Sequence, residues 1–215
     1  IKTPLTSIIN YVNLLRMEDI ENERARSYIE IIDEKSQRLK QLTMDLVEAS
    51  RISSGNIKLD MQKIDIVELV YQTGGEFNEK FETKELTIVT KLPKSAVFIY
   101  ADGRQLYRAV ENLYNNVAKY ALEKTRVYVE VMAKDGRAVF SIRNVSERSL
   151  AQENSNAGDL TERFTRGDSS RTTEGSGLGL SIAKNLTGLM GGEFKITVDG
   201  DLFIATMVFP LYTEA

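Results

Sequence analysis

Three closely spaced glycines stand directly before an apolar run that can form a helix. They are Gly175, Gly177 and Gly179, and the apolar run that follows them reaches Met190. Glycine lets the backbone adopt a positive φ and approach a ligand closely. A helix N-terminus adds unpaired N–H groups and the positive end of the helix dipole. We therefore expect this segment to bind phosphate groups.

A second segment whose residue types could bind a ligand is ENLYNNVAKY, residues 111–120. Asn112 and Asn116 are four residues apart and share one face of a helix, on the flank of its apolar stripe. Lys119 and Tyr120 fall on the same flank. Amide oxygens can bind Mg²⁺, and an ammonium group can lie against a phosphate as a point charge. For this segment alone, a solvated helix flank explains the pattern equally well.

Composition removes several chemistries from this chain. Its 215 residues fit one or two domains, and a net charge of −3 does not favour nucleic-acid binding. The absence of cysteine and histidine excludes disulfides, thiolate or imidazole metal ligands and Ser-His catalysis. No apolar run reaches about 18 residues, so we expect no membrane-spanning helix. Because the chain begins at Ile1 without methionine, we interpret it as a fragment of a longer protein.

Residues 1–54 predict an antiparallel helical hairpin with a polar turn near residues 19–22. Apolar residues recur at helical spacing before the turn and as a heptad stripe after it, with one polar member. Two hairpins can bury such stripes as a four-helix bundle, so we expect a homodimer. Packing of the hairpin on its own C-terminal domain is the alternative. The stripe consists of Leu5, Ile8, Val12, Leu15, Ala25, Tyr28, Ile32, Lys35, Leu39, Leu42, Leu46 and Ala49.

Residues 55–215 mix helices and strands behind a linker at Ser53–Gly55. Asp102 can cap a long helix that ends near Ala121. The buried stripe of this helix is expected to be Leu106, Val110, Leu113 and Val117. Further helices are expected at 66–81 and 178–190, and strands at 86–91, 97–100, 127–132 and 138–144.

Turn residues complete the prediction for this second part. Asp135-Gly136 predicts a hairpin, Gly191-Gly192 ends a helix, and a last hairpin at 193–210 turns at Asp199-Gly200. The polar stretch 145–176 lacks periodicity, which is typical of a functional lid. Together these elements predict an α+β chain whose second part is an α/β sandwich, with a mainly antiparallel sheet on one side and helices on the other.

Four segments resemble the sensor histidine kinases of two-component systems. ENLYNNVAKY resembles their N box, ERFTRGD their F box and GSGLGLSIAKNL their glycine-rich G2 box. IKTPLTSIINYVNLL resembles the stretch just after their phosphoacceptor histidine. The segments follow the family's order and spacing, and the resemblance covers essentially the whole chain. It implies a dimerising helical hairpin, residues 1–54, followed by an ATP-binding domain of the GHKL (Bergerat) fold, residues 55–215.

The resemblance implies ATP and Mg²⁺ as ligands and assigns roles to the N-box residues. Asn116 would be the main Mg²⁺ ligand, with Asn112 assisting. Lys119 would contact the phosphates, and Tyr120 would line the nucleotide cleft.

The lid and the glycine-rich segment receive roles in the same way. Phe164 would anchor the lid, and Arg166 would approach the γ-phosphate. Backbone N–H groups of Gly175, Gly177 and Gly179 would bind the phosphates, and Leu178 and Leu180 would be the apolar residues that hold this loop in place.

The adenine site departs from the family pattern. The family has an aspartate in a D-x-G-x-G box after the strand that ends here at Asn144, but this chain reads SIRNVSERS. Asn144 takes the aspartate's position, and both glycines are missing. Its amide oxygen can still accept from the adenine N6 amino group, and its NH₂ can donate to N1. The alternative is that Asn144 merely ends a strand.

The phosphoacceptor histidine is a second departure. The family motif would place it two positions before Ile1, followed by an acidic residue. Thr3 falls where many members carry the residue that orients water for phosphatase action, although it can equally be a first-turn helix residue before Pro4. Pro4 resembles the family's helix-bending proline.

The resemblance implies autophosphorylation by Mg-ATP and relay of the phosphoryl group to the receiver domain of a response regulator, which the kinase can also dephosphorylate. We expect no nucleic-acid partner and no membrane contact from these residues, and a cytoplasmic location as part of a membrane-anchored bacterial receptor. The altered adenine box leaves open a degenerate nucleotide-binding module that acts as a phosphatase or scaffold. Another GHKL ATPase is a further alternative, against which the IKTPL hairpin argues.

Overall fold

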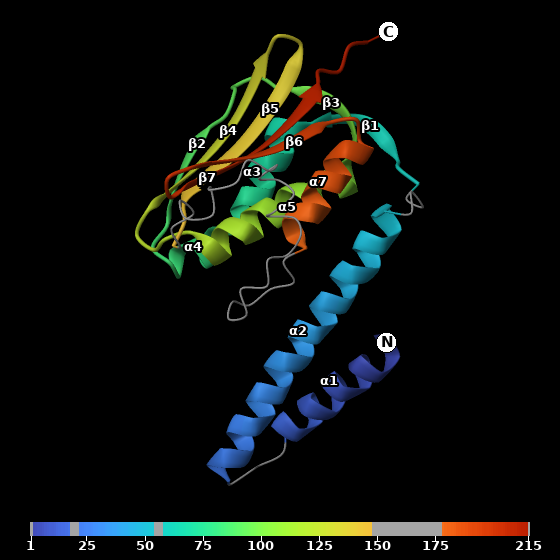
Figure 1. The fold of residues 1–215 in the computed structure, drawn as a ribbon, viewed down its shortest axis with the longest axis vertical. Helices are drawn as coiled ribbons and strands as arrows, with labels where there is room; N and C mark the ends of the chain where they lie inside the picture. The colour runs from blue at the N-terminus through green and yellow to red at the C-terminus, as the bar shows by residue number, and fades with distance from the viewer. Residues whose placement is uncertain (1, 18–21, 54–57, 148–177, 215) are drawn as a thin grey trace.

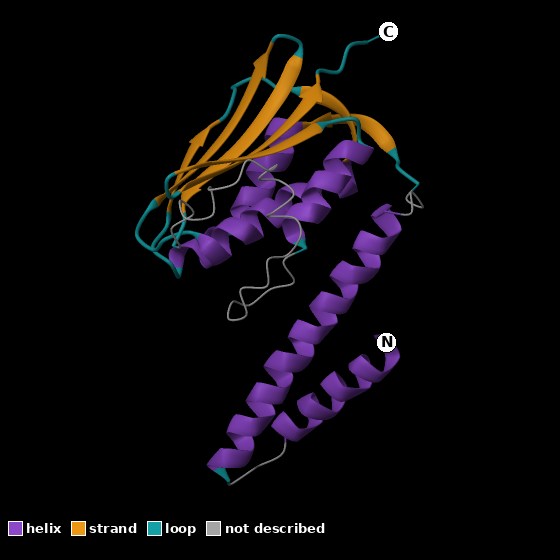
Figure 2. Cartoon of the chain, viewed as in Figure 1, coloured by secondary structure: helices purple, strands orange, loops and turns teal. Residues whose placement is uncertain are grey.

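The computed structural model describes residues 2–17, 22–53, 58–147 and 178–214. A helical hairpin comes first, and a domain in which helices cover one face of a sheet follows (Figure 1; Figure 2). This arrangement confirms the predicted α+β class. No helix within the described ranges is both long and apolar enough to cross a membrane.

The hairpin consists of α1 (Lys2–Met17) and α2 (Glu23–Ser53). Asn22 caps α2, because its Oδ1 accepts from the N–H groups of Arg24 at 3.0 Å and Ala25 at 3.3 Å. Leu5 and Val12 of the predicted stripe are buried against α2.

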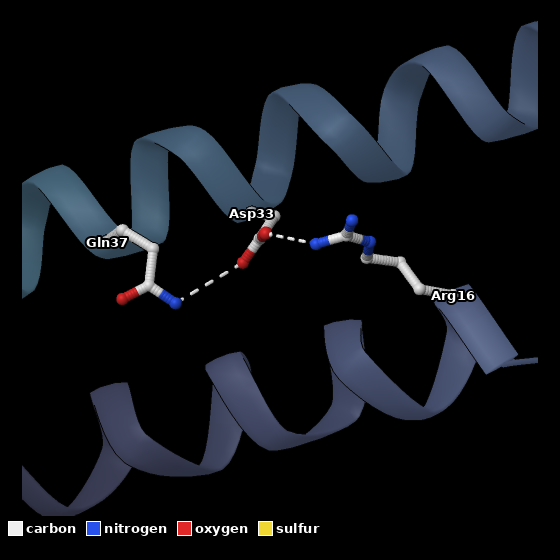
Figure 3. A network of polar contacts seen from close by, with 3 residues as sticks. All are labelled: Arg16, Asp33 and Gln37. Carbon is white, nitrogen blue, oxygen red and sulfur yellow. Dashed lines mark hydrogen bonds and ion pairs between the residues drawn. The ribbon is translucent and has the colours of Figure 1, made fainter. Parts of the chain in front are cut away.

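A polar network joins the two helices near the turn (Figure 3). Arg16 Nη1 lies 2.8 Å from Asp33 Oδ2, and Gln37 Nε2 donates to Asp33 Oδ1 at 3.4 Å. One carboxylate thus receives donors from both helices. Because its partners come from α1 and α2, this network favours one register between the helices.

The predicted stripe is only partly the seam inside the hairpin. Besides Leu5 and Val12, the buried positions within the described hairpin are Ile9, Ile29, Ser36 and Thr43, each one residue after a stripe position. A helix in a four-helix bundle buries a face wide enough for two neighbours, and one hairpin supplies only one of them. α2 also contacts α7, as in the alternative expectation, but five stripe residues stay 46% to 63% exposed: Ile8, Leu15, Tyr28, Ile32 and Leu39.

The second part is built on a five-stranded sheet in the order β2-β4-β5-β7-β6. β2 and β4 are parallel, and the other neighbours are antiparallel, as the sequence predicted. The strands are β2 (Thr87–Lys91), β4 (Arg126–Lys134), β5 (Arg137–Val145), β6 (Glu193–Asp199) and β7 (Leu202–Pro210). The helices on one face are α3 (Ile66–Glu76), α4 (Asn78–Glu82), α5 (Gly103–Tyr120) and α7 (Gly179–Leu189).

Alternation and helical spacing place the core where the sequence predicted it. Val127, Val129 and Val131 of β4 point inward and are at most 2% exposed. They pack against the stripe of α5, all four of whose members are fully buried: Leu106, Val110, Leu113 and Val117. The helix that carries the two asparagines is therefore held firmly on the sheet.

The turn predictions are also confirmed. Asp135 and Gly136 join β4 to β5 with φ values of 49° and 72°. Gly191, with φ 77°, follows α7, and Gly200, with φ 62°, turns the last hairpin. These positive φ values are the reason that glycine stands at three of the four positions.

Two local predictions were incomplete. The expected helix 66–81 is divided at Phe77 into α3 and α4, because the Phe77 N–H bonds to the carbonyl of Gly74 and ends the helix there. The strand β1 (Met61–Asp65) was missed, and it pairs antiparallel with β3 (Phe98–Asp102) in a separate two-stranded sheet. β1 has only five residues and gains its hydrogen bonds from a strand far away in the sequence, so local periodicity hardly marks it.

Candidate functional site

The N-terminus of α5 is capped by the residue that the sequence predicted. Asp102 Oδ1 accepts from the N–H groups of Arg104 and Gln105, both at 3.0 Å, and its Oδ2 accepts from the Asp60 N–H at 2.9 Å. Burial opposes ionisation of this carboxyl, but the three backbone N–H groups outweigh it, so the pKa of Asp102 lies below its ordinary value. The cap joins the start of α5 to the segment before β1.

The predicted flank of α5 is half-buried at Asn112, Asn116, Lys119 and Tyr120. The Asn112 amide is oriented, because its Nδ2 donates to the Arg108 carbonyl at 2.9 Å and leaves Oδ1 free of that bond. Asn115 is exposed on a different side of the helix and accepts from Lys80 Nζ at 3.3 Å. The asparagines with predicted roles thus share a partly covered flank that Asn115 does not share.

The N-terminus of α7 meets this flank. A Cβ built on Gly179 would lie 3.0 Å from Asn112 Oδ1, closer than ordinary van der Waals contact. A larger residue at this position would have to displace the amide by a few tenths of an ångström, so glycine favours the close passage of α7 past Asn112. Leu180 is buried in the core, and Leu178 packs partly against it. The structure brings together two motifs, the asparagine-bearing helix and the glycine-rich helix start, that lie far apart in the sequence.

Asn144 lies at the end of β5, paired with Val127 on one side and Phe203 on the other. It is 1% exposed, and its Nδ2 donates to the Val145 carbonyl at 2.9 Å. Its Oδ1 is buried without a hydrogen-bond partner. A flipped amide would set two oxygens against each other, so the carbonyl fixes the orientation. An unpaired buried acceptor is costly, and a ligand with an N–H donor would satisfy it.

The C-terminal end of α5 is joined to the end of β5. The Glu147 N–H donates to the Tyr120 carbonyl at 2.9 Å, and the Leu122 N–H donates to the Val145 carbonyl at 2.9 Å. Lys119 Nζ lies 4.9 Å from the centroid of the Tyr120 ring, within the range of a cation–π interaction. The backbone segments that carry Lys119 and Asn144 are therefore joined at one junction.

Several predicted residues cannot be placed. Phe164, Arg166, Gly175 and Gly177 lie outside the described residues. Thr3 belongs to α1, but the structure does not describe its side chain. Their roles stay predictions.

A metal ion at this site would depend on amide and phosphate oxygens. In the part of the chain that the structure describes, no group of three or more acidic side chains could hold a metal ion. The free Oδ1 of Asn112 fits Mg²⁺, which prefers oxygen ligands and usually keeps several waters and substrate phosphates. The residues present therefore fit the cation that the resemblance implies.

One contact at the site was missed in the sequence. Lys84, between α4 and β2, donates to the Lys119 carbonyl at 2.9 Å and reaches the Ala121 carbonyl at 3.4 Å. A single lysine in a turn, 35 residues before Lys119, carries no periodic or motif signal. Only the tertiary structure places it at the end of α5.

Comparison with known families agrees with this geometry. The model of the histidine kinase-, DNA gyrase B-, and HSP90-like ATPase family matches residues 101–212. The model of the His Kinase A (phospho-acceptor) domain matches residues 1–55. The chain belongs to the sensor histidine kinases, with a His Kinase A region followed by an ATPase domain of this type.

Individual relatives carry the same two regions. The chain is 30% identical over 213 residues to the sensor protein VanSC of Enterococcus gallinarum, covering 98% of this chain and 58% of the relative. It is 29% identical over 202 residues to the circadian input-output histidine kinase CikA of Synechococcus elongatus, covering 91% of this chain and 26% of the relative. The chain thus spans little more than half of the first relative and about a quarter of the second.

Solved structures show the same fold. Full-length ShkA, solved in complex with AMPPNP, matches with a TM-score of 0.80 and 26% identity, over 99% of this chain and 44% of ShkA. The histidine kinase AdeS of Acinetobacter baumannii matches with a TM-score of 0.67 and 18% identity, over 99% of this chain and 97% of AdeS. At that identity, the likeness to AdeS supports the fold alone.

Proposed function

We propose that the chain binds Mg-ATP between α5 and the N-terminus of α7 and transfers the γ-phosphoryl group to a histidine of the hairpin region. The observation that carries this proposal is the close approach of Gly179 to Asn112 Oδ1, 3.0 Å for an added Cβ. It brings the phosphate-binding end of a helix to an oriented amide oxygen. A triphosphate with its cation needs both features.

The residues of the site divide the work of phosphoryl transfer. Asn116 and Asn112 hold Mg²⁺, which neutralises charge on the phosphate oxygens when bound. Lys119 contacts the phosphates, Tyr120 lines the cleft, and Arg166 approaches the γ-phosphate. Such transfer depends on positioning and charge neutralisation more than on covalent chemistry by the protein.

Asn144 supplies the contact to the base. Its buried Oδ1 has no donor in the described structure, and the adenine N6 amino group is a donor of suitable chemistry. The remaining N–H of its amide is available to N1. Both donors and acceptors of the adenine edge can thus be met by one residue that lacks a charge.

The remaining roles follow from the family. Phe164 anchors the lid, Gly175 and Gly177 add backbone N–H groups, and Leu178 and Leu180 hold this segment on the core. The phosphoryl group passes from the histidine to an aspartate of a response regulator, which docks on the hairpin, and Thr3 orients water for the reverse dephosphorylation. The hairpin, residues 1–54, pairs with a second copy through its exposed stripe, and residues 55–215 form the catalytic domain in the cytoplasm.

Titration calorimetry with ATP and Mg²⁺ tests the nucleotide site. Asn116→Ala is expected to weaken binding at least tenfold, because it removes a cation ligand. Asn115→Ala is the matched control: it is the same substitution one residue earlier, at an exposed position on another side of α5. Equal affinities for the two variants would refute the assignment. Phosphorylation is then measured on a longer version of the protein that includes the acceptor histidine.

A second candidate function is a degenerate module that binds nucleotide weakly and acts as a phosphatase or scaffold. The specific observation in its favour is the neutral Asn144 at the position of the family's aspartate. Asn144→Asp would restore a charged acceptor for the base. A large gain in ATP affinity, together with phosphatase activity but no autophosphorylation of the longer protein, would favour this function over the kinase.

A further inference from the structure

We infer that Lys84, which belongs to none of the kinase motifs, is a positioning residue for the base-reading Asn144; this inference rests on the proposed nucleotide site. Its side chain is half-buried between α4 and β2 and donates into the last turn of α5. The backbone carbonyl of Lys84 also accepts from the Lys124 N–H at 3.1 Å. The residue therefore holds the end of α5 by its side chain and the turn after α5 by its backbone.

The last carbonyls of a helix have no partners inside the helix and must find them elsewhere. At the end of α5, Lys84 Nζ donates to the carbonyls of Lys119 and Ala121, at 2.9 and 3.4 Å. The Glu147 N–H donates to the Tyr120 carbonyl, which lies between these two. A lysine cation at this place also lies at the negative end of the helix dipole. Lys84 thus stabilises the geometry in which the helix ends.

The end of α5 in turn bonds to the Val145 carbonyl, on a strand residue that also pairs with Leu202 of β7. Leu122, the residue directly after the Lys84-bound Ala121 carbonyl, donates its N–H to the Val145 oxygen at 2.9 Å. The same oxygen accepts from Asn144 Nδ2, also at 2.9 Å. The contact from Lys84 therefore reaches Asn144 through one helix end and one shared carbonyl, and it favours the amide orientation that leaves Oδ1 free.

The consequence is specific to the base. With Oδ1 presented, the site accepts a hydrogen bond from a purine amino group and gains nothing from a purine that lacks one. If Lys84 no longer held the helix end, the amide could turn and offer Nδ2 instead. Binding of the phosphates would weaken for all nucleotides alike, but discrimination for the amino group would be lost.

The test compares the affinities of ATP and of purine riboside triphosphate, which lacks the 6-amino group, for three variants. The unchanged protein should prefer ATP by about three- to tenfold, the value of one neutral hydrogen bond. Lys84→Met should lower this ratio to about twofold or less. Lys84→Arg, which keeps a cationic donor, should restore it. Lys124→Met is the matched control, because the exposed Lys124 side chain pairs with the exposed Glu85 in the described contacts, and the substitution keeps the backbone N–H that bonds to Lys84.

The ratio of the ATP affinity to the purine riboside triphosphate affinity distinguishes a positioning role from a purely stabilising one. Partial unfolding would lower both affinities by the same factor and leave this ratio unchanged. An unchanged ratio in Lys84→Met, or an equal loss in Lys124→Met, would overturn the inference. If Lys84→Met does not fold, Lys84→Ala takes its place with the same expected loss, because it too removes the donor to the helix-end carbonyls. Binding of ATP by the unchanged protein without preference for the amino group would overturn this inference and leave the proposed function standing, whereas absence of any binding would overturn both.

Discussion

Gly74 of α3 and Tyr114 of α5 form a contact whose energy can be isolated with two substitutions. Tyr114 is buried in a cluster with the rings of Phe77 and Phe81, and its hydroxyl donates to the Val70 carbonyl at 3.3 Å. Burial raises the pKa of this phenol above its ordinary value, so it stays protonated. A Cβ built on Gly74 would lie 2.9 Å from the Tyr114 Oη but 3.5 Å from its Cζ.

These distances predict that Gly74→Ala lowers the free energy of unfolding when Tyr114 is present and raises it when Tyr114 is replaced by phenylalanine. In the unchanged protein, Gly74→Ala forces the stiff, buried tyrosine to move, which costs about 1–3 kcal/mol and exceeds the gain of about 1 kcal/mol in helix propensity. In a Tyr114→Phe background the clashing atom is gone and the next contact is ordinary. Gly74→Ala should then stabilise the domain by about 0.5–1 kcal/mol. The coupling free energy between the two substitutions should be about 2 kcal/mol.

Urea unfolding followed by circular dichroism measures all four proteins of this cycle. Gly75→Ala is the control, because no atom lies within 4 Å of its added Cβ. It should be neutral or slightly stabilising in both backgrounds. Equal destabilisation by Gly74→Ala with and without the tyrosine hydroxyl would refute the reasoning. The pair matters for function because it fixes the approach of α3 to the helix that carries the asparagines.

Three further predictions concern the site, the helix cap and the hairpin. Gly179→Ala should weaken Mg-ATP binding severalfold in calorimetry by displacing the Asn112 amide, whereas Gly188→Ala in the same helix, with no atom within 4 Å of the added Cβ, should not. The pKa of Asp102 is lower in the folded state than its ordinary value of 3.8, so its contribution to stability is present above that pH and is lost as the pH falls further. Asp102→Asn keeps the cap through Oδ1 but puts an NH₂ donor where Oδ2 accepts from the Asp60 N–H, so it should lower stability at neutral pH. It should also flatten the acid limb of stability measured by urea unfolding between about pH 5 and 2, and an unchanged acid limb would contradict this. Ile32→Glu should convert a dimer into a monomer in analytical ultracentrifugation, because this 47%-exposed residue lies on the expected bundle stripe; a persistent dimer would exclude that stripe as the interface.

Local chemistry predicted most of the catalytic domain. Asp102 as an N-cap, Asp135-Gly136 as a hairpin turn and the stripe of α5 each depend on residues close together in the sequence, and each is confirmed. The strand β1 was missed, because its partner β3 lies more than 30 residues away and contributes most of the stability. The break at Phe77 was missed for a similar reason, since Phe77 serves an aromatic cluster with Tyr114 of another helix.

The candidate site shows the same division. The asparagines of α5 and the glycine at the start of α7 could be selected by residue type and spacing, and the resemblance ordered them. The sequence could not predict that these motifs approach each other, or that Oδ1 of Asn144 has no hydrogen-bond partner among the described residues. Both features depend on how one element packs against another.

The sequence by itself determined the hairpin and the sandwich, most of the helix and turn boundaries, and the residue types that can bind a nucleotide, because these follow from periodicity, capping and short motifs. Only the tertiary structure decided which hairpin face stays exposed, which way the Asn144 amide turns, and that Lys84 holds the end of α5. These features depend on hydrogen bonds and packing between distant segments, and no local pattern of residues records the distance between two atoms that meet only when the chain is folded.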